Sequence, residues 1–125
     1  MVARESGAFQ AYQERLLSSK ETDTIITTVF TGRPARGLRN SFLNEYLKSG
    51  VEPLSWPFQA LAADNIYFNA HASNNADYFP LLAGQELRML KKGQTAAEIV
   101  EEIMSEAGEN LSELNKVMMH SDKSS

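Results

Sequence analysis

The stretch TGRPARGLRN, Thr31–Asn40, decides the fold of this 125-residue chain. It follows a run rich in β-branched residues, Thr24–Phe30, which is typical of a strand. It leads into Leu38–Lys48, where apolar residues recur at the period of a helix. Its glycines and proline restrict the backbone, because glycine permits positive φ and proline fixes φ at about −65°. We therefore predict a strand, a shaped turn and a helix in this order.

Three arginines, Arg33, Arg36 and Arg39, stand at every third position of this stretch. Guanidinium groups bind phosphates and carboxylates through paired hydrogen bonds, so one interpretation is an anion-contacting turn. The interpretation we favour is structural, with the arginines pairing with carboxylates and helix-terminal carbonyls to lock the turn. No basic stripe continues the patch, and the net charge is −4. Nucleic acid is therefore not an expected partner.

The composition is that of a globular protein, with 42% hydrophobic and 22% charged residues. The chain has no cysteine, which excludes disulfides and thiolate chemistry. Its only two histidines, His71 and His120, lie far apart in the sequence, so we assign neither a metal site nor a catalytic residue. No apolar run approaches the roughly 20 residues of a membrane helix, and no signal peptide is evident. We expect a cytoplasmic protein with no membrane partner.

The rest of the pattern is mostly helical. Thr95 and Glu98 form a capping box that opens a well-defined helix, and Gly108 is expected to end it. The strand at residues 24–30 has no partner of comparable quality, which indicates a fragment or pairing between chains. We expect one strand and about five or six helices, the clearer ones at residues 7–18, 38–48, 95–107 and from 57 and 110 onward.

The segment Gly32–Asn40 after a threonine-rich strand resembles the C-terminal region of the nitronate monooxygenase (2-nitropropane dioxygenase) family. Glu5–Ala8 and Leu82–Gln85 resemble the same family in the same order, and the resemblance covers about residues 1 to 107. It implies an FMN enzyme with an α/β TIM-barrel fold, of which this chain is the C-terminal, mostly helical segment. A complete barrel takes about 250 residues, more than this chain supplies. The related flavin enoyl reductases carry a similar segment.

The resemblance also implies a division of the chain. Residues 1–20 correspond to the final barrel helix, 21–120 to a mostly helical cap region and 121–125 to a disordered tail. The segment that grips the FMN phosphate and the catalytic histidine of the family fall in the part that precedes this chain. Gly84 and Gln85 are the residues expected near the flavin or substrate. The alternative is that Gly84 kinks a helix and Gln85 caps it.

The implied reaction is oxidation of a small alkyl nitronate by dioxygen to a carbonyl compound and nitrite. The missing barrel half, or another chain, would be needed for it. The alternatives from other classes are a small helical protein-interaction module, which would dock through the strand edge or the arginine turn, and a non-functional truncation.

Overall fold

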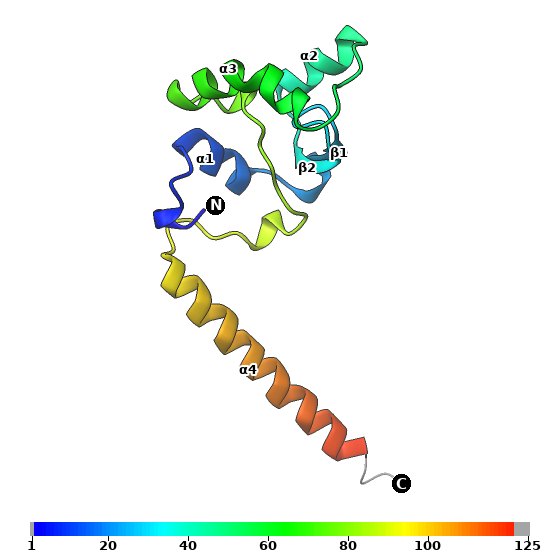
Figure 1. Cartoon of the computed structure of the whole chain (residues 1–125). Helices are drawn as coiled ribbons and strands as arrows, with labels where there is room; N and C mark the ends of the chain where they lie inside the picture. Colours follow the sequence, from blue (N-terminus) through cyan, green and yellow to red (C-terminus); the bar gives the residue numbers. More distant parts are fainter. Residues whose placement is uncertain (1, 122–125) are drawn as a thin grey trace. The chain divides into compact units, whose positions relative to one another are not determined.

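The computed structural model describes residues 2–121, and its chain forms two compact units. One unit comprises residues 2 and 6–92, and the other comprises residues 3–5 and 93–121. The α-helices and strands of the described residues are α1 (Gln10–Ser18), β1 (Thr24–Thr27), β2 (Ala35–Leu38), α2 (Ser41–Ser49), α3 (Phe58–Ala72) and α4 (Ala96–Ser121) (Figure 1).

The prediction of a single unpaired strand is wrong. β1 pairs antiparallel with β2, in a register that runs from Thr24 opposite Leu38 to Thr27 opposite Ala35. The second half of the arginine stretch is therefore the partner strand. Its sequence, ARGL, contains no β-branched residue, so local propensity gives no sign of it.

The turn between the two strands requires glycine at Gly32. Its φ is 87°, in the left-handed region that favours glycine. A Cβ at this position would also lie 2.5 Å from both the carbonyl oxygen of Leu54 and the amide nitrogen of Trp56. The segment before α3 is therefore packed directly against the turn.

Val29 and Phe30, expected at the end of the strand, lie outside β1 and are buried in the core.

Two apolar clusters form the core, and both lie within the described residues of the first unit. One centres on α1 and residues 81–87, with Tyr12, Leu16, Leu38, Leu81 and Leu87 among its buried members. The other centres on α2, α3 and the hairpin turn, with Val29, Phe30, Phe42, Leu43, Ala63 and Tyr67 buried.

Asn40 connects the start of α2 to the 76–79 segment. Its Oδ1 accepts the backbone N–H of Leu43 at 3.1 Å and so caps the helix. Its Nδ2 donates to the carbonyl oxygens of Phe79 at 2.8 Å and Ala76 at 3.2 Å. The side chain is only 2% exposed, so all three bonds are made in the interior. The predicted helix over 38–48 is present, but it starts at this cap, and Gly50 ends it in the left-handed conformation as expected.

The described residues contain four α-helices rather than five or six. One reason is that the apolar segment 77–90 forms no α-helix. It holds only the end of one 3-10 turn, η3 (Ala76–Tyr78), and a second, η4 (Leu87–Met89). At the N-terminus, a 3-10 turn at Arg4–Ser6 precedes α1, which begins at Gln10 rather than Gly7.

The other reason is that α4 continues through Gly108 as one helix of 26 residues, so the expected stop there is wrong. A mid-helix glycine costs only about 1 kcal/mol relative to alanine, so a single glycine does not by itself end a helix. The capping box is present, because the Glu98 N–H donates to Thr95 Oγ1 and the Thr95 N–H donates to Glu98 Oε2. The Thr95 N–H and the Thr95 hydroxyl both donate to the Glu98 carboxylate, and these two bonds lower the pKa of that carboxyl.

Over the described range, none of the helices combines the length and apolar character that crossing a membrane requires. Of the tail predicted at residues 121–125, Ser121 is the last residue of α4, and residues 122–125 lie outside the described residues.

Candidate functional site

The segment that carries Gly84 and Gln85 is attached to β2 as an extended piece of chain. The N–H of Leu38 donates to the carbonyl oxygen of Leu81 at 2.8 Å, and the N–H of Ala83 donates to that of Arg36 at 3.1 Å. Gly37 and Leu82 form the corresponding antiparallel bridge. A Cβ on Gly37 would lie 2.9 Å from the Leu81 oxygen, so glycine permits this close approach. The alternative of a helix kink at Gly84 is wrong, because the residues around it are not helical.

Tyr12 of α1 fixes the same segment from its other side. Its hydroxyl donates to the carbonyl oxygen of Leu82 at 2.6 Å. Burial raises the pKa of this phenol to about 12, although the hydrogen bond to Leu82 acts in the opposite direction. Tyr12 therefore stays protonated at neutral pH and remains a donor. Two backbone hydrogen bonds and the hydrogen bond from the Tyr12 hydroxyl thus fix the position of the chain immediately before Gly84.

A small cavity of about 170 Å³ lies beside this segment. Gly84 is at its wall, and a Cβ there would meet only the Glu86 carboxylate, at 3.5 Å. Gln85 is exposed and does not line the cavity. The lining is apolar apart from one carboxylate, and consists of Val2, Leu16, Ala83, Gly84, Glu86, Leu87 and Leu90. Of the two predicted cofactor residues, Gly84 is thus the one that lines this cavity.

The three arginines have separate surroundings. The guanidinium of Arg33 stacks over the ring of Trp56, 4.2 Å from its centroid. Arg36 is in β2, and its Nη1 donates to Thr24 Oγ1 at 3.0 Å across the hairpin. Arg39 follows the strand and is exposed. The contacts of Arg33 and Arg36 are with an aromatic ring and a hydroxyl, and neither is one of the carboxylate or helix-terminal carbonyl pairings that we expected. An anion site formed by the three side chains remains a prediction.

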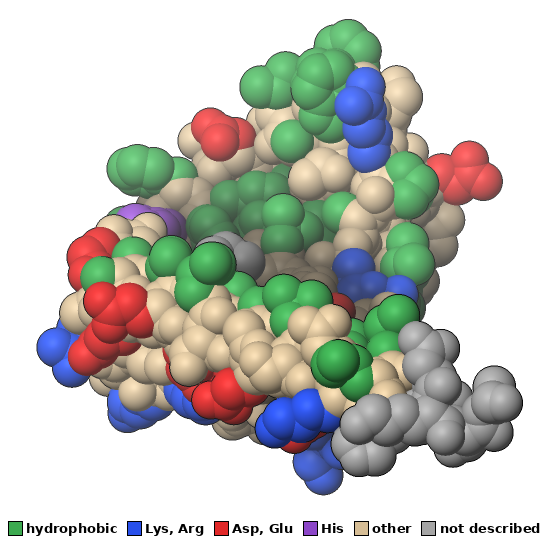
Figure 2. All heavy atoms as spheres, turned by 90° about the horizontal axis from the view of Figure 1, so that it is seen from below, with side chains coloured by type: hydrophobic (Ala, Val, Ile, Leu, Met, Phe, Trp, Pro, Cys, Tyr) green, Lys and Arg blue, Asp and Glu red, His purple; other side chains and the backbone are tan. Residues whose placement is uncertain are grey.

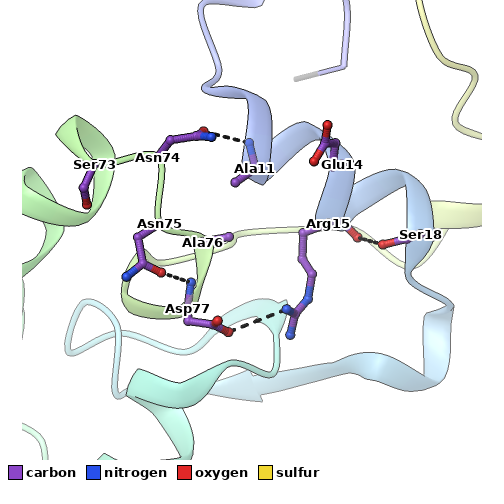
Figure 3. Close-up of a pocket in the computed structure, with 9 residues that line it drawn as sticks. All are labelled: Ala11, Glu14, Arg15, Ser18, Ser73, Asn74, Asn75, Ala76 and Asp77. Carbon is purple, nitrogen blue, oxygen red and sulfur yellow. Dashed lines mark hydrogen bonds and ion pairs between the residues drawn. The ribbon is translucent and has the colours of Figure 1, made fainter.

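A wider cleft of about 630 Å³, which the sequence did not indicate, lies between α1 and residues 73–77 (Figure 3). Asn74, with φ of 55°, accepts the N–H of Ala11 at 2.9 Å and so caps α1 from a distant part of the chain. Arg15 lies 3.6 Å from the Asp77 carboxylate and also donates to the carbonyl oxygen of Arg39 at 3.0 Å. These bonds join α1 to two other segments. The only signal in the sequence was the polar Asn74–Asn75 pair.

His71 is packed against aromatic rings. Its ring meets Phe9 edge-on, with centroids 5.1 Å apart, and lies 6.0 Å from Phe79. These contacts give it a packing role at the end of α3. In the part of the chain that the structure describes, no three histidine, aspartate or glutamate side chains are grouped as metal ligands would be.

Comparison with known proteins identifies relatives of the chain. Residues 1–106 match the sequence model of the family described as nitronate monooxygenase. A probable nitronate monooxygenase of Staphylococcus saprophyticus is 33% identical over 109 residues, which are 87% of this chain and 30% of that protein. The corresponding protein of Bacillus subtilis is 28% identical over 106 residues, which are 85% of this chain and 30% of that one. The chain thus spans about 30% of the length of these curated relatives.

Solved structures give a consistent result. Nitroalkane oxidase from Streptomyces ansochromogenes superposes with a TM-score of 0.80 at 31% identity, covering 90% of this chain and 32% of the oxidase. FabK from Thermotoga maritima superposes with a TM-score of 0.71 at 23% identity, covering 91% of this chain and 36% of FabK. At that lower identity the second likeness shows the fold alone.

Proposed function

Because this chain belongs to the nitronate monooxygenase family, we propose that it is the C-terminal part of an FMN-dependent TIM-barrel enzyme that oxidises alkyl nitronates. In the proposed reaction dioxygen converts the nitronate to a carbonyl compound and nitrite. The observation that carries the proposal is the family match over 106 residues, which the superposition on nitroalkane oxidase supports. Since the chain spans about 30% of its relatives, the activity belongs to the longer assembly.

Within that assembly, the contribution of this chain is positional. α1 serves as the final barrel helix, and residues 21–120 form the cap region. The bonds from Leu38, Ala83 and Tyr12 hold the 81–83 segment in place, so that Gly84 and Gln85 are presented to the remainder of the enzyme. The exposed amide of Gln85 is the group we expect to contact flavin or substrate.

The described residues do not fit a complete flavin site. The cavity beside Gly84 contains one carboxylate, from Glu86, and no basic side chain lines it. Arg33 and Arg36 have partners in the hairpin region. A flavin phosphate requires several hydrogen-bond donors or positive charges, which this cavity does not supply. We therefore expect the chain alone to bind FMN weakly or not at all.

The test is an FMN titration of the purified chain, followed by the same titration after coexpression with the preceding two-thirds of the Staphylococcus saprophyticus relative. We expect flavin fluorescence to be unchanged by the chain alone. The pair should copurify as a yellow complex that consumes oxygen when an alkyl nitronate is added. A chain that stays yellow by itself through gel filtration, or a folded pair without flavin, would contradict the proposal.

The role of Gln85 is tested in the same complex. We expect Gln85→Ala to weaken FMN or nitronate binding several-fold while leaving the fold intact, because the side chain is exposed. Gln10→Ala is the matched control, since Gln10 is an exposed amide on α1 that bonds Glu14. Equal affinities in the two variants would remove Gln85 from the site.

A further inference from the structure

α4 presents an apolar stripe whose spacing is that of a coiled coil. Its positions are separated alternately by four and three residues, as the a and d positions of a heptad are. The larger side chains of this set are between 59% and 67% exposed. Figure 2 shows hydrophobic side chains along one edge of the helix nearest the viewer, with both acidic and basic side chains along the other. The stripe consists of Val100, Met104, Ala107, Leu111, Leu114 and Met118.

Most of the charges of α4 lie away from this stripe. Glu102, Glu106, Glu109 and Glu113 occupy heptad positions that face outward in a coiled coil. The positions that flank the stripe are Glu101, Ile103, Gly108, Asn110, Asn115 and Val117, of which only one is charged. A second copy of the helix would therefore meet apolar and neutral surface, without the repulsion that the net charge of −4 suggests.

We propose that α4 pairs with α4 of a second copy of this chain as an antiparallel coiled coil. With the centre of the pair at Glu109, Val100 faces Met118 of the second copy, Met104 faces Leu114, and Ala107 faces Leu111. Because the pair is symmetric, each of these three contacts occurs twice, which gives six layers. Each layer places a smaller or flexible side chain against a larger one, which favours close packing.

Charge determines the direction of pairing. The half of α4 up to Gly108 carries four carboxylates, those of Glu98, Glu101, Glu102 and Glu106. The other half carries Glu109 and Glu113, together with Lys116, the only lysine or arginine of the helix. A parallel pair would place the two more acidic halves side by side. An antiparallel pair separates them and also opposes the helix dipoles, which lowers the electrostatic energy.

This inference goes beyond the proposed enzyme function. The family match ends at residue 106, whereas three of the six stripe positions, Leu111, Leu114 and Met118, follow it. A helix with an apolar face of this length gains most of its stability by burying that face. The chain itself thus supplies a partner of matching pattern.

The first experiment measures the mass of the full chain by sedimentation equilibrium. We expect a dimer, and we expect Leu111→Glu to weaken dimerisation more than about tenfold, because it places a carboxylate in the apolar seam. Ser112→Glu is the matched control, since it adds the same charge one position away on the outward side, and it should leave the dimer intact. A monomeric wild-type chain, or equal effects of the two variants, would overturn the proposal.

The second experiment remains informative if Leu111→Glu disturbs the helix. The chain has no cysteine, so single introduced thiols report on geometry without background. Chains carrying Val100→Cys and chains carrying Met118→Cys are mixed and oxidised. We expect a disulfide between the two kinds of chain. Linkage of Met118→Cys chains to one another at the same yield would show a parallel pair and overturn the arrangement. The absence of any linkage, as in a helix that folds back on its own chain, would overturn it as well.

Discussion

Among single residues, Gly32 is the one whose replacement should be most costly. Gly32 and Gly50 both have φ in the left-handed region, at 87° and 69°. A Cβ at Gly50 meets nothing within 4 Å, whereas at Gly32 it would collide with backbone atoms 2.5 Å away. We expect Gly50→Ala to lower the free energy of unfolding by about 1–2 kcal/mol. Gly32→Ala should cost about 3 kcal/mol or more, because the clash adds to the strain.

Urea unfolding of the two variants measures both effects. Their difference isolates the close approach of Gly32 to Leu54 and Trp56, because the left-handed conformation is common to both positions. Losses of equal size would mean that the backbone before α3 moves away from the turn without cost.

Two buried tyrosines make the stability of the fold sensitive to alkaline pH. Burial raises the pKa of Tyr12 from its ordinary 10.0 to about 12, and it also raises the pKa of Tyr67, whose hydroxyl donates to the carbonyl oxygen of Phe30. A phenol whose pKa is higher in the folded state than in the unfolded state favours unfolding once the unfolded chain deprotonates. The Tyr12 contribution should be complete below about pH 10 and disappear as pH rises towards 12.

The measurement is the free energy of unfolding as a function of pH. Tyr12→Phe should be less stable at neutral pH, because the carbonyl oxygen of Leu82 loses its donor. The free energy of unfolding of this variant should also decline less steeply above pH 10, since the variant lacks the ionisable hydroxyl of Tyr12. A decline identical to that of the parent chain would exclude Tyr12 as a source of the pH dependence.

Among the elements, those with a helical period and a local cap were predictable. The helix now assigned to α2 was expected from its apolar spacing and from Gly50, and the start of α4 from the Thr95–Glu98 box. β2 was missed because ARGL has no strand propensity, and its pairing with β1 depends on the turn at Gly32. The extended form of 81–83 was missed because its hydrogen bonds come from residues 36 and 38, far away in the sequence.

The same reasoning applies to the candidate site. Gly84 was selected by resemblance, and it lines a cavity. Tyr12, which holds the neighbouring carbonyl, and Asn74, which caps α1, carry no local motif. Their partners are 70 and 63 positions away, so only the folded chain reveals their roles.

The continuity of α4 gives a prediction about Gly108. A Cβ there meets nothing within 4 Å, and the residue lies inside a regular helix. Gly108→Ala should therefore stabilise α4 by about 1 kcal/mol. On heating, the variant should retain more of its helical circular dichroism signal than the parent chain. Gly93→Ala is the control, because Gly93 has a φ of 81° and alanine there should be destabilising. A loss of helicity in the Gly108 variant would indicate a helix break at that residue.

For the whole molecule, the division into two units predicts that the first folds without α4. Both apolar clusters consist of residues between Val2 and Leu90. A chain ending at Lys92 should therefore keep a cooperative thermal transition and the near-ultraviolet signal of its buried tyrosines. It should also be monomeric if α4 carries the dimer contact. Loss of the cooperative transition would show that α4 is needed for the core.

The bridge between Gly37 and Leu82 also has a consequence for the order of folding. The hairpin of β1 and β2 closes a short loop, so its residues need to lose little chain entropy to meet. We expect residues 81–83 to reach β2 later, because the loop that must close to bring them together contains α2 and α3 and is much longer. During synthesis the hairpin is complete long before this third segment leaves the ribosome. We therefore expect the piece of chain that presents Gly84 and Gln85 to pair with β2 late in folding, after the hairpin has formed.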